Sequence, residues 1–428
     1  MGKLQEAYRT IKGDNFPSVM TITLGEGSHA QSLRYEKVGW DLEGKLQGLR
    51  YGENHNQEAA LYKLVNGNLE LGDVKTIKPG MHLVSDMELL QSGKHPGKTN
   101  ITDADNALNI IRYFSDQPVC SIMKHNNPCG VALGSDPCEA YIQADFADRV
   151  AAFGGAIAFN KPVDKETAEQ IIKRYAEVVV APDYEEGVMD ILGRKKDLRV
   201  MQIGAIERLN EWVGKRVLDF KSLIDGSQIV QFSYVPNVKT LDDVKGLKLG
   251  YGEHQGKEYV INRAPTEEEY RDMLFGWLVE TGITSNSVIY VKDGVTVGIG
   301  TGEQDRVGVA KIAVAKAYDK MRDLISFMEH DIPYNELEER SIKEGRQEDK
   351  DIIDAIEETV REKKGGLIGA TAVSDAFYPY RDGVDVALRQ GVSAFIHPGG
   401  SKRDYQAVEA CNEAGATMVY TGLRSFKH

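Results

Sequence analysis

The 428-residue sequence has the composition of an ordinary globular protein, with 41% hydrophobic and 27% charged residues. These proportions exclude a disordered chain, a collagen and a coiled coil. The 65 acidic and 52 basic side chains give a formal net charge of −13. Because no basic tail offsets this charge, we do not expect a nucleic-acid-binding protein. The length predicts roughly two to four domains, each large enough to bury its own core.

The sequence carries no sign of export or membrane insertion. Its first residues are charged and lack the apolar core of a secretory signal. No apolar run approaches the ~20 residues that span a bilayer. The four cysteines are sparse and include no CxxC pair of the kind that binds zinc or forms a redox centre. We therefore expect a cytoplasmic protein without a metal site.

Helices and short apolar strands alternate along the first half of the chain. Up to about residue 60 the sequence is rich in turns and includes one strand-like run, Ser18 to Leu24. Helical spacing of apolar residues then predicts helices at 107–114, 137–146 and 165–175. Apolar, β-branched runs predict buried strands at 119–123, 156–159 and 178–180. Such alternation is typical of an α/β domain with a layered sheet.

The second half repeats this alternation after a less regular stretch. Residues 185–250 hold the basic run Gly193 to Arg199 and strand-like pieces at 200–203 and 228–234. We therefore divide the chain into a first α/β domain (1–200), a connecting segment (201–245) and a second α/β domain (246–428). The second domain is predicted to have helices at 270–281 and 405–414, strands at 287–292, 296–299, 394–396 and 417–420, and a charged helical insertion at about 309–364.

The segment Lys124 to Gly130, KHNNPCG, directly follows a predicted buried strand, and we expect the residues after Lys124 to form a loop at the carboxyl end of that strand. Ligands of α/β folds bind at strand ends. An imidazole next to an ammonium group is suited to proton transfer, because the cation stabilises developing negative charge. The alternative interpretation is a solvated Lys-His pair in a tight turn, and the heptapeptide alone leaves both open.

Two further segments also have two interpretations. The glycines of Gly298 to Gly302 allow the backbone to approach a ligand closely, with Arg306 placed to bind an anion, but a structural turn explains them equally well. The aromatic residues between Ser374 and Asp382 suit a heterocycle, although such residues more often belong to a core.

Eight ordered segments carry a resemblance to one family. They are LRYGEN from Leu49, KHNNPCG from Lys124, AAFGGAIAFN from Ala151, VVVAPDYEEGV from Val178, SNSVIYVKDGVTVGIGTGEQDR from Ser285, SDAFYPYRDGVD from Ser374, HPGGSKRD from His397 and TGLRSFKH from Thr421. With them the chain closely resembles the transformylase part of the bifunctional purine-biosynthesis enzyme that formylates AICAR (5-aminoimidazole-4-carboxamide ribotide) and then closes the ring to inosine monophosphate.

The resemblance implies a fold and a reaction. The implied fold is a pair of cytidine-deaminase-like, three-layer α/β/α domains with a helical insertion. The implied reaction moves the formyl group of 10-formyltetrahydrofolate to the 5-amino group of AICAR. Because the match begins near residue 50, we expect a freestanding transformylase without cyclohydrolase activity. The zinc-ligand pattern of the related deaminases, H-x-E with P-C-x-x-C, is absent from the sequence.

The resemblance also assigns residues. His125 would be the general base, Lys124 would stabilise the transition state, and Asn286 would orient the amine and the formyl oxygen. The residues assigned to the nucleotide are Arg50, Tyr51, Gly154, Glu177, Arg306, Phe377 and Arg424. Those assigned to the folate are Val307, Asp382, Ser401 and Lys402. The resemblance further implies a homodimer with shared active sites and allows a structural potassium ion.

The chain departs from the family at one loop. Where the family usually has RYGENPHQ, this sequence has His55-Asn56 in place of Pro-His, which changes the expected conformation after Tyr51. A second hypothesis of a different class is a catalytically silent homologue that binds nucleotide as a regulator or scaffold. Loss of Lys124, His125 or Asn286 would favour that hypothesis, and all three residues are present.

Overall fold

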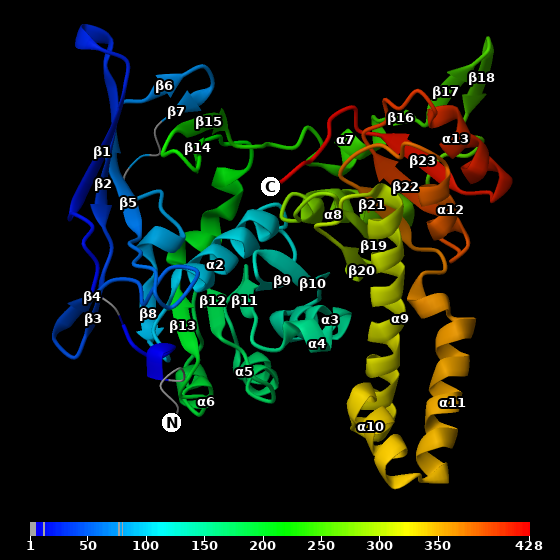
Figure 1. The fold of residues 1–428 in the computed structure, drawn as a ribbon, viewed down its shortest axis with the longest axis horizontal. Coiled ribbons are helices and arrows are strands. Elements are labelled where there is room, and N and C mark those ends of the chain that lie inside the picture. Colours follow the sequence, from blue (N-terminus) through cyan, green and yellow to red (C-terminus); the bar gives the residue numbers. More distant parts are fainter. Residues whose placement is uncertain (1–5, 12, 76–77, 79) are drawn as a thin grey trace. The chain divides into compact units, whose positions relative to one another are not determined.

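The structure, a computed structural model, describes residues 6–11, 13–75, 78 and 80–428 (Figure 1). Its contacts divide the chain into two compact units. Unit 1 comprises Met1–Val119 and Gly154–Val235, and unit 2 comprises Cys120–Phe153 and Pro236–His428. The predicted domains are continuous in sequence, whereas these units are not, because residues 120–153 belong to the same unit as the C-terminal half of the chain. Both units combine helices with β-sheet, so the α/β class is confirmed. The cytidine-deaminase-like domain type stays a prediction.

Unit 1 is built on parallel strands with helices packed against them. Strands β11 (Ala156–Phe159), β12 (Val178–Ala181) and β13 (Arg199–Gln202) are parallel, and β8 (Glu88–Gln91) pairs antiparallel with β13. Helix α2 (Lys98–Ile111) contacts β11 and β12, and α5 (Lys165–Ile171) packs on α6 (Val188–Leu192). Strands β11 and β12 are fully buried, as their continuous apolar sequences predict.

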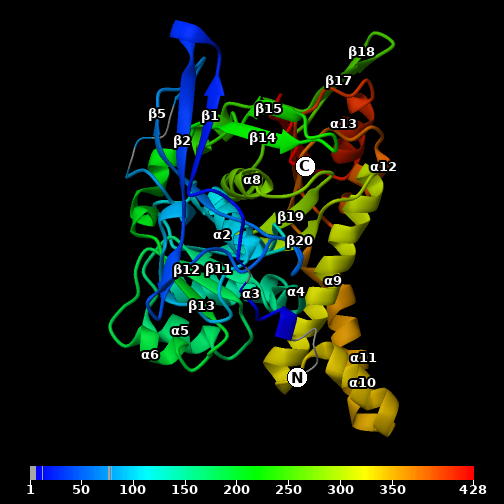
Figure 2. The same ribbon diagram turned by 60° about the vertical axis from the view of Figure 1, so that its left-hand side comes forward.

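Unit 1 also holds an antiparallel sheet that the sequence analysis missed, except for its first strand. Its order is β1 (Val19–Leu24), β2 (Gln31–Lys37) and β5 (Tyr62–Gly67). Short ribbons join β3 (Trp40–Leu42) to β4 (Lys45–Gln47), and β6 (Glu70–Leu71) to β7 (Val74–Lys75). A third ribbon pairs β14 (Leu218–Ser222) with β15 (Gln228–Phe232), and Figure 2 shows these strands from a second side.

Unit 2 contains a larger mixed sheet. Its order is β16 (Lys248–Leu249), β23 (Thr417–Tyr420), β22 (Ala394–His397), β21 (Thr371–Ser374), β19 (Val288–Lys292), β20 (Val295–Gly300), β10 (Asn127–Leu133) and β9 (Val119–Lys124). Strands β21, β22 and β23 are parallel, whereas β19 is antiparallel to both β20 and β21. Strand β10 lies where the sequence predicted a loop after Lys124, so that prediction was wrong.

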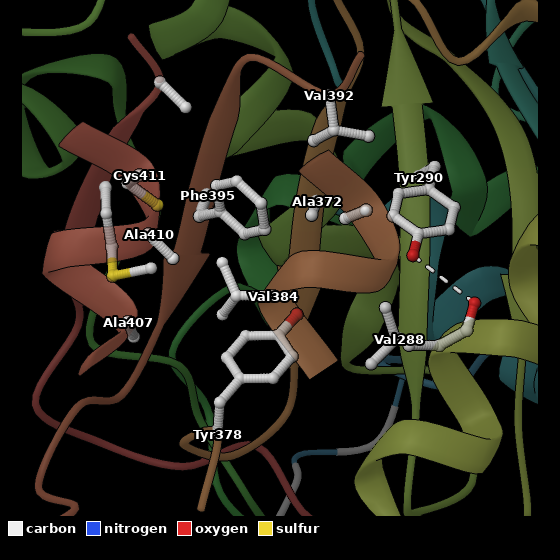
Figure 3. Packing of buried hydrophobic residues seen from close by; sticks show 14 of the residues in the cluster. Val288, Tyr290, Ala372, Tyr378, Val384, Val392, Phe395, Ala407, Ala410 and Cys411 are labelled. Carbon is white, nitrogen blue, oxygen red and sulfur yellow. Dashed lines mark hydrogen bonds between the residues drawn. The ribbon is translucent and has the colours of Figure 1, made fainter. Parts of the chain in front are cut away.

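Helices cover both faces of the unit 2 sheet. Helices α9 (Arg306–His330), α12 (Asp382–Leu388) and α13 (Asp404–Glu413) contribute to one hydrophobic core with Tyr290 and Phe395 (Figure 3). The Tyr290 hydroxyl donates a hydrogen bond to the carbonyl of Ala310 at 3.3 Å. Helix α8 (Glu267–Glu280) packs on the opposite face, where Gly276 meets Val373 and Val291. The remaining helices near the sheet are α3 (Pro137–Ala147), α4 (Arg149–Ala152) and α7 (Leu241–Lys245).

The predicted helical insertion is helical in the structure. Helix α9 continues into α10 (Tyr334–Glu344) and α11 (Gln347–Glu362), which run beside it (Figure 1). These helices share a small core of their own, centred on Leu337, Ile356 and Val360. The insertion is therefore stabilised by local apolar packing as well as by its attachment to α9.

The glycines of strand β20 make room for helix α9. A Cβ atom on Gly298 would lie 2.3 Å from the carbonyl oxygen of Ala313, and one on Gly300 would lie 2.3 Å from that of Val309. Both glycines lie within the strand rather than in a turn. These glycines therefore allow α9 to pack closely on β20. The sequence analysis had considered only a ligand-binding segment or a structural turn.

Gly298→Ala is therefore expected to destabilise unit 2, because the added methyl group collides with backbone that cannot rotate away. Overpacking of this kind costs about 1–3 kcal/mol. The matched control is Gly204→Ala, whose Cβ would have no atom within 4 Å. Urea unfolding should show a lower midpoint for Gly298→Ala and an unchanged one for Gly204→Ala, and equal midpoints for the two variants would contradict this account.

Candidate functional site

The Lys124–His125 pair lies at a hairpin turn between β9 and β10. His125 and Asn126 form the turn, with positive φ angles of 56° and 63°. Two residues with positive φ are characteristic of the type I′ turn, whose twist matches that of the flanking strands. His125 is exposed, whereas Lys124 is half-buried and its Nζ donates to the carbonyl oxygen of Phe153 at 2.7 Å. The turn thus presents the imidazole to solvent, and the Phe153 carbonyl holds the ammonium of the preceding residue.

Hydrogen bonds tie this turn to the segment that ends in Asn286. The Asn127 side-chain oxygen accepts from the backbone N–H of Thr284 at 2.9 Å and from the Thr301 hydroxyl at 3.1 Å. Near the C-terminus, Lys427 Nζ donates to the carbonyl of Asn126 at 3.2 Å, and the Lys427 carbonyl accepts from Ser285 N–H at 2.9 Å. Unit 2 therefore brings the three predicted catalytic residues onto two neighbouring, mutually bonded segments.

Asn286 is held by a buried arginine. Arg306, the first residue of α9, is only 7% exposed. Its Nη2 donates to the side-chain oxygen of Asn286 at 2.9 Å, and its Nη1 donates to the Ser287 carbonyl at 2.7 Å and to the carboxylate of Asp375. The guanidinium group is thus shared among protein acceptors in the segment directly before β19 and in the loop directly after β21.

A second carboxyl group lies in the same cluster. Glu280 is completely buried and accepts from the Ser287 hydroxyl, and its Oε2 has no hydrogen-bond partner among the described residues. Burial raises the pKa of Glu280 well above its usual range, and the nearby Asp375 carboxylate adds to this shift. Burial therefore favours the neutral form of Glu280, beside the ion pair of Arg306 and Asp375.

A hollow of about 670 Å³ opens beside Asn286 in unit 2. We call it the unit 2 hollow. It is lined by Asn286, Gln304, Asp305, Arg306, Ala376, Phe377, Pro379, Pro398, Gly399, Gly400, Gly422, Leu423, Arg424 and Phe426. The exposed side chains of Phe377 and Arg424 offer it an aromatic ring and a cation, with the Arg424 guanidinium 4.7 Å from the ring centre of Phe426. The hollow thus combines apolar walls with a cation, as many small-molecule sites do.

The four residues assigned to the folate do not line this hollow. Val307 follows Arg306 on α9, and Asp382 is the first residue of α12. Ser401 and Lys402 follow Gly400, and the Ser401 N–H donates to Asp404 at 3.1 Å. Each of these four residues is exposed or half-buried. Val307 directly follows the lining residue Arg306, and Ser401 and Lys402 directly follow the lining residue Gly400. Their role toward a folate stays a prediction.

A second hollow, of about 540 Å³, lies in unit 1. This unit 1 hollow is lined by Tyr8, Arg9, Arg50, Tyr51, Lys94, Glu177 and Arg199. Three residues assigned to the nucleotide therefore line one hollow: Arg50, Tyr51 and Glu177. The Arg50 guanidinium lies over the Tyr51 ring at 4.4 Å and donates to the Lys94 carbonyl at 2.9 Å.

The unit 1 hollow is rich in desolvated positive charge. Burial lowers the pKa of both Arg50 and Arg199, although the neighbouring tyrosines and Glu177 oppose the shift. Arg199 is completely buried and donates to a Glu177 carboxylate oxygen at 3.3 Å, an oxygen that also accepts from Asn100 at 3.0 Å. One carboxylate thus faces several cations, so the hollow favours an anionic ligand.

Gly154 is not among the residues that line this hollow, but it contacts Tyr175, which is bonded to the lining residue Lys94. Its N–H donates to the Tyr175 carbonyl at 2.8 Å, its φ is +78°, and a Cβ there would lie 3.3 Å from the Tyr175 ring. Tyr175 in turn accepts from Lys94 at 3.3 Å. A glycine is required by both the left-handed backbone and the nearby ring.

The sequence analysis missed Lys94 and Arg199. Arg199 ends the basic run Gly193 to Arg199, where it resembled an exposed charge. Its only signal was its position directly before the buried strand residues Val200 and Met201, where an ionised side chain requires a partner. Lys94 gave no signal, because its neighbours in the hollow are distant in the sequence.

Two general features complete the description. Within residues 6–11, 13–75, 78 and 80–428, no group of three or more His, Cys, Asp and Glu side chains is placed to hold a metal ion. None of the described helices combines the length and the apolar character needed to cross a bilayer.

The fold and its two hollows define an α/β protein with cationic pockets suited to an anionic small molecule. The family model of the AICARFT/IMPCHase bienzyme matches residues 18–316 of the chain. The chain belongs to this family, and the resemblance found in the sequence is confirmed at that level.

Three relatives, each named bifunctional purine biosynthesis protein PurH, illustrate the similarity. The protein of Aquifex aeolicus is 36% identical over 384 residues, which cover 90% of this chain and 60% of the relative. That of Caldicellulosiruptor saccharolyticus is 31% identical over 422 residues, covering 98% and 63%. That of Xanthomonas oryzae pv. oryzae is 35% identical over 385 residues, covering 90% and 58%. The chain thus spans about 60% of the length of these relatives.

The buried charge cluster predicts opposite outcomes for two similar substitutions. Asp375→Asn removes the charge that balances Arg306, and breaking a buried ion pair costs about 3–5 kcal/mol. Glu280→Gln replaces a carboxyl group that already holds its proton, so we expect little loss. Urea unfolding should show a large drop in midpoint for Asp375→Asn only. A drop of the same size in Glu280→Gln would mean that Glu280 is ionised.

Proposed function

We propose that the chain transfers the formyl group of 10-formyltetrahydrofolate to the 5-amino group of AICAR, giving formyl-AICAR in inosine monophosphate biosynthesis. The observation that carries the proposal is the placement of Lys124 and His125 on an exposed turn bonded to the segment of Asn286. Membership of the AICARFT/IMPCHase family and the cationic hollows, which suit a ribotide phosphate, support it.

The acceptor amine requires help from the protein. Its lone pair is delocalised into the imidazole and carboxamide, so it is a poor nucleophile. In the proposed step the amine nitrogen bonds to the formyl carbon while the His125 imidazole takes the amine proton, and the bond from the formyl carbon to folate N10 breaks. The departing N10 takes a proton from the Lys124 ammonium, which regains one from solvent while His125 releases the amine proton to solvent. The exposed position of His125 allows it to approach a substrate directly.

Lys124 and Asn286 have supporting roles in this proposal. The Lys124 ammonium lies next to His125 and stabilises the negative charge that develops on the formyl oxygen. The Asn286 side-chain oxygen is occupied by Arg306, which leaves its amide N–H₂ as the group that faces a ligand and donates also to the Gln304 carbonyl at 3.1 Å. Arg306 is thus a positioning residue for Asn286 as well as a proposed nucleotide contact.

The binding assignments are part of the same proposal. Arg50, Tyr51, Gly154 and Glu177 in unit 1, and Arg306, Phe377 and Arg424 in unit 2, would bind the nucleotide. Val307, Asp382, Ser401 and Lys402 would contact the folate. Guanidinium groups match the geometry of phosphate and carboxamide oxygens. We further propose that the 428-residue chain leaves formyl-AICAR uncyclised, because the motifs assigned here all belong to formyl transfer.

The alternative function, a silent nucleotide-binding homologue, predicts binding without turnover. The two functions share the cationic hollows and differ only in the use of His125 and Lys124. An assay of the purified chain with synthetic AICAR and 10-formyltetrahydrofolate separates them, because only the enzyme produces formyl-AICAR and tetrahydrofolate.

The decisive variant is His125→Ala. Loss of a positioned acid–base group typically lowers turnover by about 10²–10⁴-fold. We expect kcat to fall by this factor while the affinity for AICAR, measured by calorimetry, changes only a few-fold. Asn126→Ala, next to it on the same exposed turn, is the control for disturbance of the hairpin. Near-normal turnover in His125→Ala would remove His125 from the mechanism.

We also propose a homodimer with shared active sites. The acceptor is small and the folate donor is long, and a groove between subunits can bind both. The charged helices α10 and α11 are poor candidates for the centre of the interface, since charged residues are depleted there.

Complementation tests the shared site. His125→Ala and Arg424→Ala should each be inactive, and Arg424 is exposed, so its loss leaves the core intact. If the two residues of one site come from different chains, mixed dimers regain one intact site, or about a quarter of full activity after complete exchange. A fully active monomer in sedimentation would refute shared sites. An inactive mixture after demonstrated subunit exchange would refute this division of residues between chains.

A further inference from the structure

The unit 1 hollow receives two side chains from the N-terminal segment that precedes the residues matched by the family model. The family match begins at residue 18, yet Tyr8 and Arg9 line the hollow together with Arg50 and Lys94. Residues 6–10 form a helical turn, in which the N–H groups of Arg9 and Thr10 donate to the Glu6 carbonyl at 3.0 and 3.1 Å. The local backbone of this segment is therefore defined by its own hydrogen bonds.

Two contacts hold this segment against the rest of unit 1. The Tyr8 ring packs edge-on against the His55 ring, with centres 5.2 Å apart. Both terminal nitrogens of Arg9 donate to the Asp197 carboxylate, at 3.3 and 3.2 Å. His55 is the residue that stands where the family usually has proline, and a proline would offer Tyr8 no aromatic ring. The departure at this loop thus supplies the ring that Tyr8 of the N-terminal segment contacts.

The charges around the hollow do not balance. Arg9, Arg50, Lys94 and Arg199 supply four cationic side chains, and Lys94 shares the carboxylate of Asp197 with Arg9 at 3.0 Å. Partial burial acts to raise the pKa of Asp197, but Lys94 and Arg9 lower it overall. Four cationic side chains thus share two acidic partners, Asp197 and Glu177. The protein as a whole has a net charge of −13, so this local excess of positive charge is opposite in sign to the overall charge.

We propose that Arg9 is an additional phosphate-binding side chain of the unit 1 hollow, held in place by the Tyr8–His55 and Arg9–Asp197 contacts. The ligand class is a phosphomonoester, and its identity as the AICAR phosphate rests on the proposed function. A guanidinium group has five N–H donors, so Arg9 can keep a bond to Asp197 and still donate to a phosphate oxygen. Arg9 thus adds to the affinity for the phosphorylated acceptor and takes no part in the chemical step.

The test compares Arg9→Gln with Arg216→Gln in the full 428-residue chain. Arg216 pairs with Asp73 at 3.2 Å, is partly exposed like Arg9, and lies outside the hollow, so the two variants share the same change in charge. Calorimetry measures the binding of AICAR and of the corresponding riboside, which lacks the phosphate. Hydrogen bonds to charged groups predict a roughly 10- to 100-fold loss of AICAR affinity in Arg9→Gln. Riboside affinity should be unchanged, and so should both affinities in Arg216→Gln.

The aromatic contact provides a second, independent variant. Tyr8→Ala should weaken AICAR binding by a smaller factor than Arg9→Gln, because it loosens the segment without removing the cation. Tyr8→Phe keeps the ring that packs on His55 and should restore most of the lost affinity. An equal loss in Tyr8→Ala and Tyr8→Phe would contradict a role for the ring contact.

Other outcomes separate this inference from the proposed function. Equal AICAR affinity in Arg9→Gln and the unsubstituted chain, or an equal loss for AICAR and the riboside, would overturn it. Inorganic phosphate serves as a probe that does not depend on formyl transfer. If phosphate and AICAR bind, and bind more weakly to Arg9→Gln, the inference stands even when no formyl-AICAR is made. If the unsubstituted chain binds neither, the inference fails.

Discussion

The ion pair between Arg306 and Asp375 is the constraint on which the unit 2 site depends. It joins the start of α9 to the loop after β21, and the same guanidinium holds the side chain of Asn286. In a buried setting such a pair is stable only when its remaining donors and acceptors are bonded, and the Ser287 carbonyl and the Ser374 hydroxyl meet that need. Glu280 is tolerated beside the pair because it keeps its proton. The orientation of Asn286 therefore depends on this buried ion pair as well as on the bond from its amide group to the Gln304 carbonyl.

The unit 1 hollow follows a different principle. Its cations are not neutralised, and the protein keeps them in place through backbone carbonyls and one shared carboxylate. Leaving desolvated arginines partly uncompensated lowers stability, and the same arrangement strengthens the attraction for an anion that supplies the missing charge. Because the protein as a whole carries a net charge of −13, the attraction for an anion depends on the cations gathered at such a hollow rather than on the overall charge.

The sequence was most informative where structure is local. Strand β12 and helix α13 lie within a residue of their predicted bounds, since apolar periodicity and flanking turns specify them. Strand β10 was missed because Pro128 and Gly130 argue against a strand, whereas its pairing with β20 depends on distant residues. Sequence motifs identified Arg50 and Asn286 as candidate site residues, but no local sequence pattern indicated that Lys94 or Arg199 lines a hollow. Those two reach the hollow through packing, which a single sequence does not encode in any short segment.

The catalytic turn shows how far its geometry depends on remote parts of the chain. A left-handed residue other than glycine costs about 1–2 kcal/mol, so the His125–Asn126 turn requires support beyond its own backbone. That support comes from Asn127, bonded to Thr284, and from Lys427, which donates to the Asn126 carbonyl. Lys427 also donates to Gly282 at 3.0 Å, so one side chain near the C-terminus links both segments. The position of the imidazole is thus determined jointly by a hairpin, a central loop and the end of the chain.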